Sequence, residues 1–338
     1  MKKLLLFASA LSLSFISAQT YDNGGLSTGS TSNSGSAAPS GYTWSEVQNN
    51  TGNTTESNTT AGYAGVYVSS TNSYFLADDF VVPAGVSWTI SSIEFFGYQT
   101  SYTGTTSPFN TVRLSIYDTD PSLPGATPIF GDDTTNRFAS SSQAMMYRIF
   151  NSTVPSTANI PGTSRRIWKV VGNVGTTLQP GTYWVKFQLK TPSNAAAFIP
   201  SVTVPGTRGL PTFNAKQYDA ISSTWINLVD EGDPSSAPDY PQDVPFVINY
   251  TATNLGISEA LQYDNRILVY PNPVKESFKI SNVGHLNIKK LEIIDQSGRL
   301  VKILKAQEEY NVSTLSSGNY ILKIYSDEVT KITKLLKQ

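Results

Sequence analysis

Apolar and polar residues alternate one by one along most of this 338-residue chain, and Pro/Gly turn signals interrupt the alternation at short intervals. Residues 112–117 place Val112, Leu114 and Ile116 on one face of an extended segment. Residues 182–189 repeat the alternation with aromatic side chains on both faces. Because an amphipathic helix needs an apolar period of 3.6 residues, a period of 2 predicts β-strands.

The alternating segments predict an all-β protein, with an antiparallel β-sandwich or jelly-roll body followed by a small Ig-like C-terminal β-sandwich. Short strands separated by turn residues are typical of both architectures. The expected strand segments of the body are 42–47, 64–70, 75–85, 87–99, 112–117, 165–171, 182–189 and 245–250.

The first 18 residues have the features of a secretory signal peptide. Lys2 and Lys3 form a positive start, and residues 4–16 are an apolar run of 13 residues, which is short for a bilayer span. Small residues end the segment at Ala18, so we expect passage through the Sec translocon and cleavage before Gln19. No later apolar run approaches 18 residues, so the mature protein is not expected to span a membrane.

Composition divides the rest of the chain into four segments. Residues 19–41 are rich in Gly, Ser, Thr and Asn and are expected to be disordered. Residues 42–250 form the body. Residues 251–265 are interpreted as a linker, and residues 266–338 as a separate small domain.

Charge and residue usage exclude several classes of function. Residues 20–252 carry 16 Asp and Glu against 10 Lys and Arg, so the body is acidic, whereas nucleic-acid binding calls for a basic face. The chain has no Cys, and its single His, His285, lies outside the body. Thiolate zinc sites, thiol nucleophiles and His-based triads are therefore excluded from the body, and no cofactor is expected.

Carboxylate chemistry is the remaining route to catalysis. A glycan hydrolase needs two carboxyl groups at a fixed separation, and the body has four Glu, at positions 46, 56, 94 and 231, besides its Asp residues. The Glu residues form no paired strand motif, so a non-catalytic protein is favoured. A carboxylate-dependent glycan hydrolase stays open as an alternative.

Asp118 and Asp120 follow the strand at 112–117, and Asp132 and Asp133 come soon after. Calcium takes several hard oxygen ligands, so these four residues are the candidates for a calcium site. The other interpretation is that Asp118 and Asp120 form Asx-type turns before Pro121.

Aromatic residues at outward strand positions and in loops suggest a carbohydrate-binding surface, since rings and amides together bind sugars. Among them, Tyr218 and Trp225 are the predicted ligand contacts. The competing interpretation places these rings in the core, and a structural or adhesive surface protein is the second functional hypothesis. The outward aromatic residues are Tyr98, Tyr102, Tyr117, Trp184, Tyr218, Trp225 and Tyr240.

Residues 266–338 carry an ordered series of motifs. In chain order they are Tyr270-Pro271-Asn272-Pro273, a turn between Asp295 and Gly298, then Leu315, Gly318 and Tyr320, and a basic closing strand with Lys331 and Lys334. This series resembles the type A C-terminal sorting domain of proteins secreted by the type IX system of Bacteroidetes. The resemblance implies a partner in the type IX secretion machinery, and export to the cell surface or the medium. Residues 77–90, 116–125 and 178–187 together resemble β-sandwich regions of secreted bacterial proteins of unknown function.

Overall fold

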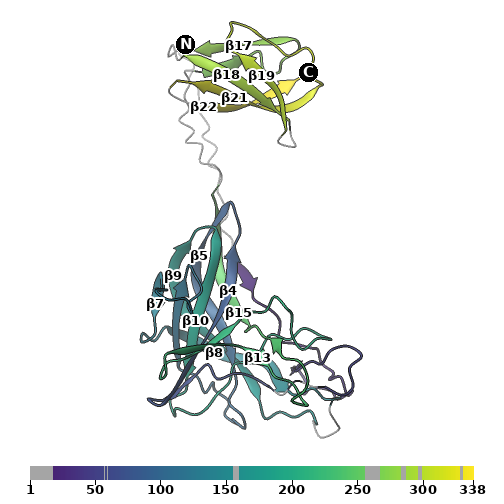
Figure 1. Ribbon diagram of the computed structural model, residues 1–338, viewed down its shortest axis with the longest axis vertical. Coiled ribbons are helices and arrows are strands. Elements are labelled where there is room, and N and C mark those ends of the chain that lie inside the picture. Colours follow the sequence, from purple (N-terminus) through teal and green to yellow (C-terminus); the bar gives the residue numbers. More distant parts are fainter. Residues whose placement is uncertain are drawn as a thin grey trace, which may run out of the picture. The chain divides into compact units, whose positions relative to one another are not determined.

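The computed structural model describes residues 18–56, 58, 60–154, 160–255, 267–282, 287–295, 299–327 and 330–338. The chain divides into two compact units, Met1–Gly256 and Ile257–Gln338 (Figure 1). Each unit has its own hydrophobic core. We call them the body and the tail. Residues 1–17 of the predicted signal peptide, together with His285 and Gly298, lie outside the described residues.

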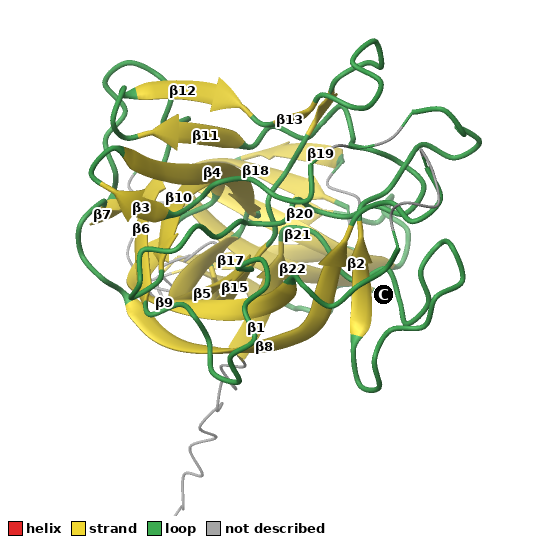
Figure 2. Cartoon of the chain, turned by 90° about the horizontal axis from the view of Figure 1, so that it is seen from below, coloured by secondary structure: helices red, strands yellow, loops and turns green. Residues whose placement is uncertain are grey.

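The body is a sandwich of two β-sheets, which confirms the predicted fold class (Figure 2). Its strand pairs are antiparallel, except that β2 and β8 are parallel. The first sheet contains, in spatial order, β1 (Ala18–Asp22), β15 (Phe246–Asn254), β5 (Val86–Gly97), β9 (Arg166–Leu178), β8 (Phe138–Ile149) and β2 (Thr43–Glu46). The second sheet contains β12 (Thr224–Asn227), β11 (Lys216–Asp219), β4 (Asn72–Val82), β10 (Gly181–Lys190), β6 (Thr111–Tyr117) and β7 (Phe130–Asp132). In addition, β3 (Tyr67–Ser69) pairs with β4, and β13 (Val229–Asp230) pairs with β14 (Tyr240–Pro241).

The two sheets pack face to face over one aromatic core. Phe95 of β5 stacks on Phe187 of β10 across the sandwich, with 4.2 Å between ring centroids and 21° between ring planes. Phe80 of β4 similarly contacts Trp88 of β5 and Phe246 of β15. Buried aromatic side chains remove large apolar areas from water, so these contacts hold the sheets together.

The chain crosses from the second sheet to the first through the turn at residues 83–85, between β4 and β5. Gly85 has φ = +82° in this turn, a conformation that L side chains rarely adopt. Pro83, Ala84 and Gly85 therefore form the turn that connects β4 of the second sheet to β5 of the first sheet.

The expectation of disorder for residues 19–41 is wrong. Residues 18–22 form strand β1, which pairs with β15 at the edge of the first sheet. The Tyr21 ring lies against Trp88 of the core with 5.7 Å between centroids, and Leu26 is buried. Although the segment is mostly polar, the packed side chains of Tyr21 and Leu26 and the pairing of β1 with β15 hold its first part in place. At the other end of the body, β15 continues to Asn254, so strand structure extends into the expected linker.

The tail is a second, smaller sandwich, as predicted. Phe278 and Tyr310 stack in its core with 5.2 Å between ring centroids. One sheet contains β16 (Ile267–Tyr270), β17 (Ser277–Asn282) and β20 (Tyr310–Asn311). The other contains β19 (Leu300–Lys305), β18 (Ile288–Ile294), β21 (Gly318–Ser326) and β22 (Thr330–Lys337).

Asn272, between its two prolines, holds the last strand of the tail. Its side-chain amide donates to the backbone oxygen of Lys334 at 2.6 Å, and its side-chain oxygen accepts from the amide of Leu336 at 2.9 Å. The next backbone bonds continue the contact, because the amide of Val274 donates to the Leu336 oxygen and Gln338 donates to the Val274 oxygen. The proline-bracketed segment therefore connects the beginning of the tail to β22.

We predict that Asn272→Ala loosens β22. The two lost hydrogen bonds are together worth about 1–3 kcal/mol, so amide hydrogen exchange in residues 330–338 should quicken roughly five- to 150-fold. Hydrogen–deuterium exchange with mass spectrometry on the full chain measures this. Lys289→Ala, an exposed change on β18, is the control; equal exchange in both variants would contradict the role of Asn272.

Candidate functional site

Aromatic and cationic side chains cover the second sheet on the face turned away from the core. Because alternate residues of a strand point to opposite faces, β10 directs Val185 and Phe187 inward and Trp184 and Lys186 outward. We call the outward group the outer-face layer. Its members are Phe75 and Ala77 of β4, Tyr117 of β6, Trp184 and Lys186 of β10, Lys216 and Tyr218 of β11, and Trp225 of β12.

Lys186 is the centre of the outer-face layer. Its Nζ lies 4.9 Å from the ring centroid of Phe75 and 5.0 Å from that of Tyr218. The same ammonium pairs with Asp133 at 2.7 Å, although the lysine side chain is only 6% exposed. Cation–π contacts and an ion pair together compensate the buried charge, so the surrounding rings are held in fixed positions.

Lys216 fixes the neighbouring loop over the same face. Its Nζ lies 5.5 Å from the ring centroid of Trp184 and 2.5 Å from Oδ2 of Asp120, and it donates to Ser122. Ala126, from the same loop, packs against the layer. Partial burial raises the pKa of Asp120, but hydrogen bonds from Lys216 and Ser122 outweigh it and bring the pKa below its usual value.

Three of the predicted surface rings are buried, so the expectation that they are exposed is wrong. Tyr117 and Trp184 lie in the outer-face layer beneath the loop that contains Ala126. Tyr98 is buried against Phe198 and is bridged to it through the backbone. For Tyr117 and Trp184, the loop that covers this face of the second sheet explains why an outward strand position did not mean solvent exposure.

The remaining predicted rings are half-buried, and two of them meet. Tyr218 and Trp225 lie side by side on β11 and β12, with 4.8 Å between ring centroids and 35° between ring planes. Tyr102 instead meets Trp168 edge-on, and Tyr240 lies under the Arg208 guanidinium. The structure thus brings together the two residues predicted to contact a ligand.

The four acids of the proposed calcium site are not brought together. Asp120 and Asp133 each form an ion pair with a lysine of the outer-face layer, and Asp118 is exposed. Within the described residues, no group of three or more His, Cys, Asp or Glu side chains is placed to hold a metal ion. Asp120 forms the Asx-type turn that was the other interpretation, by accepting from the amide of Ser122.

Asp132 stabilises its own turn. Its Oδ1 accepts from the amides of Thr134 and Thr135 at 2.8 and 2.6 Å, and these hydrogen bonds hold the pKa of Asp132 well below its usual range. Arg137 lies 3.7 Å from its other oxygen. The Asp132 carboxylate therefore stabilises its own turn, and both of its oxygens already have partners.

A buried carboxylate on the core face of β4 is not among the predicted site residues. Asp78 is fully buried, and its oxygens accept from the side chain of Asn23, the amide of Val244 and the amide of Asp79, at 2.9, 2.9 and 2.8 Å. Burial raises the pKa of Asp78 well above its usual range, and the charge of Asp243 raises it further. Asp78 ties the segment after β1 to the segment before β15.

Asp243 is the partner of Asp78 in this acidic pair. Burial raises the pKa of Asp243 to about 6, although its Oδ1 accepts from the amides of Asn214 and Ala215. The signal in the sequence was an acid at an inward position, between Leu76 and Phe80. The 164 residues between the two acids hid the pairing, because no local pattern connects Asp78 with Asp243.

The described residues of the tail motifs lie in its strands, its turns and its core. The backbone amide and Nε of Arg299 each donate a hydrogen bond to the Asp295 carboxylate at 3.0 Å. These bonds close the hairpin between β18 and β19. Leu315 is buried in the tail core, and the Tyr320 hydroxyl donates to the backbone oxygen of Ser316. The two lysines of β22 differ: Lys331 is half-buried, with its Nζ donating to the Ile267 oxygen, whereas the Lys334 side chain is exposed.

Residues 268–338 match the family model of the secretion system C-terminal sorting domain. This match confirms the resemblance drawn from the motifs, and it begins within the module expected at 266–338. No curated protein matches the chain. In the described part of the chain, no helix is long and apolar enough to cross a membrane.

The sorting domain establishes where the protein goes. Such a tail directs its cargo through the type IX secretion machinery to the cell surface or the extracellular space. The body is therefore the cargo that the tail exports, and it acts at the cell surface or in the extracellular space.

We predict that Asp243→Asn reduces the loss of stability that the body shows between pH 4.5 and 7. A carboxyl group whose folded pKa is raised destabilises the fold as it ionises, so the cost is absent at low pH and complete above about pH 6 for Asp243. Asparagine keeps the acceptor oxygen but cannot ionise. We expect the variant to gain on the order of 1–2 kcal/mol at pH 7 relative to pH 4.5, after allowance for its partial exposure.

Thermal unfolding followed at both pH values measures this difference. Asp239→Asn, at an exposed acid, is the control. A wild-type protein that is equally stable, or more stable, at pH 7 than at pH 4.5 and an unchanged Asp243→Asn profile would together contradict the assignment.

Proposed function

We propose that the body is a non-catalytic extracellular protein that binds polysaccharide, with Trp225 and Tyr218 as the contact rings. The observation that supports the proposal is the half-exposed ring pair on the outer face of a rigid sheet. Sugars present apolar C–H faces that stack on aromatic rings, and the binding face must be rigid to keep the entropic cost of binding low.

The support under the ring pair favours a preformed site. Tyr218 packs on Phe75 and is fixed by the ammonium of Lys186, so its ring cannot turn freely. Trp225 packs against the outer-face layer as well. Asn227 follows on the same face of β12 and is exposed, which supplies an amide beside the rings for hydrogen bonds to sugar hydroxyls.

The placement of the acids supports a non-catalytic body. A glycosidase pair must flank a substrate bond, yet Asp78 is sealed in the core with three donors on its oxygens. Glu46 is buried and accepts from Ser152 and Asn33, and Glu94 pairs with Lys169. These carboxylates are engaged in holding the fold.

A second candidate function is adhesion to another protein, and exposed apolar side chains on the second sheet favour it. Ile221 and Ile226, on the β11–β12 hairpin, are 49% and 57% exposed. Leu123, in the loop held by Lys216, is 53% exposed. Exposed apolar side chains are common where proteins dock, so these three residues offer a contact chemistry different from that of the ring pair.

We predict that Trp225→Ala weakens polysaccharide binding at least tenfold, which corresponds to the loss of about 1.4 kcal/mol of stacking. Binding is measured with a glycan array and then by calorimetry with the polysaccharide that scores highest. Ile226→Ala is the matched control, because it removes an exposed apolar side chain from the opposite face of the same strand. Tyr218→Phe keeps the ring and should bind within about threefold of wild type.

Two outcomes would count against this function. Adhesion would be favoured if the wild-type protein binds no polysaccharide on the array but stays attached to cells, and if Ile226→Ala loses that attachment. Equal loss of binding in Trp225→Ala and Ile226→Ala would show that the outer-face rings are not the contacts.

A further inference from the structure

Arg148 of β8 is a buried cation at the meeting point of several segments. Its side chain is 1% exposed. Nε donates to the Ala61 oxygen at 2.8 Å, Nη1 donates to Ser45 and Thr203 at 3.0 and 2.8 Å, and Nη2 donates to Ser201 at 3.1 Å. A guanidinium has five N–H donors, and these bonds use four of them, so one N–H of Nη2 is left without a partner among the described residues.

The positive charge of Arg148 has no anionic partner among the described residues, although its four acceptors satisfy most of its hydrogen bonds. All four acceptors are neutral oxygens. The nearby Arg208 is different, because Asp230 pairs with it at 2.8 Å. Burial lowers the pKa of Arg148 to about 10, and it therefore remains charged at neutral pH. A buried charge without a counter-ion is costly, and the remaining requirement is a negative charge.

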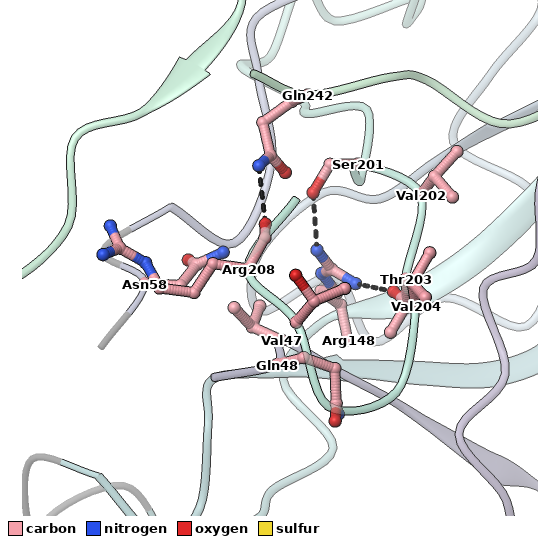
Figure 3. A pocket seen from close by; sticks show the side chains of 11 residues that line it. Val47, Gln48, Asn58, Arg148, Ser201, Val202, Thr203, Val204, Arg208 and Gln242 are labelled. Carbon is pink, nitrogen blue, oxygen red and sulfur yellow. Dashed lines mark hydrogen bonds between the residues drawn. The ribbon is translucent and has the colours of Figure 1, made fainter. Parts of the chain in front are cut away.

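A small polar cavity lies beside this guanidinium (Figure 3). The centre of a water-sized particle can occupy about 10 Å³ of it, which is room for one single-atom ion or one water molecule. Gln48, Asn58 and Gln242 contribute amide side chains to its wall, and the residues that line it include no Asp or Glu. In Figure 3, Arg148 reaches between Ser201 and Thr203, which also line the cavity.

We propose that this cavity binds one small monovalent anion of the halide class, such as chloride, beside Nη2 of Arg148. Ser201 and Thr203 accept hydrogen bonds from Arg148, and each hydroxyl has one proton of its own that it can donate to the anion. A halide accepts several such donors at once and neutralises the guanidinium, whereas a water molecule supplies no charge. Sulfate, phosphate and sugar carboxylates have too many atoms for a space of this size.

The bound anion would tie together the segments that meet at Arg148. Ser45 lies on β2, Ala61 on the chain leading to β3, and Ser201 and Thr203 on the long connection after β10. Halide concentration would then set part of the stability of the body. The site is separate from the outer-face layer, and it does not depend on the proposed polysaccharide binding.

Thermal unfolding of the full chain in sodium chloride, sodium bromide and sodium gluconate at equal ionic strength tests the proposal. Chloride and bromide should raise Tm by about 2–4 °C over gluconate, with saturation as their concentration increases. Crystals grown in bromide should show an anomalous peak beside Arg148. Equal Tm in the three salts, or bromide in the crystal without a saturable Tm effect, would overturn the proposal.

Variants separate the site from general effects of salt. Arg148→Met removes the charge and should abolish the difference between chloride and gluconate. Arg137→Met, which removes an arginine that is paired with Asp132, should keep the difference. Should Arg148→Met fail to fold, Ser201→Ala decides: it keeps the arginine and should raise the half-saturating chloride concentration at least threefold. A halide response that Ser201→Ala leaves unchanged would place the anion elsewhere.

Discussion

The contact between Phe95 and Phe187 across the two sheets is the constraint from which the rest of the body follows. These rings stack at 4.2 Å and lie among the inward side chains of both sheets. Once the inward positions are committed to this core, every alternate residue of β10 and its neighbours must face outward. The sequence places Trp184 and Lys186 at those positions, so the outer face of the second sheet carries rings and cations.

Exposing the apolar area of the outward rings to water is unfavourable, and the loop that contains Asp120 and Ala126 covers part of them. Lys186 and Lys216 bridge the rings to Asp133 and Asp120, and the loop that contains Asp120 is thereby held against the sheet. The cover reaches Trp184 but leaves the Tyr218–Trp225 pair half-exposed at the sheet edge. The Tyr218–Trp225 pair is available for binding because the loop that covers Trp184 does not bury it.

The strands that alternate cleanly could be predicted from the sequence, because burial on one face imposes period 2. Strands β6 and β10 and the strands of the tail are of this kind. Strand β8 begins with a run of Ser and other small or polar residues, and its pairing with β9 and β2 comes from tertiary contacts, so local pattern did not reveal it. Strand β1 was missed for the same reason.

The candidate sites also differ in whether they could be predicted from local sequence or depend on tertiary contacts. Tyr218 and Trp225 were predicted from residue type as ligand contacts; the structure places the two rings side by side on β11 and β12, and ligand binding stays a prediction. The depth at which Tyr98 and Trp184 are buried could not be predicted, because it depends on loops packed from elsewhere. Arg148 and the Asp78–Asp243 pair gave no local signal, since their surroundings come from residues far apart in the sequence.

The tail is a separate unit with its own core, closed by Asn272 on β22, and this independence is what allows it to act as an address for the body. The most direct measurement is fractionation of cells with a working type IX system that express the chain without residues 257–338. We expect the truncated protein to accumulate inside the outer membrane as a folded body, while the full chain and its Trp225→Ala variant reach the surface or medium. Equal delivery of the truncated and full chains to the outside would contradict the account.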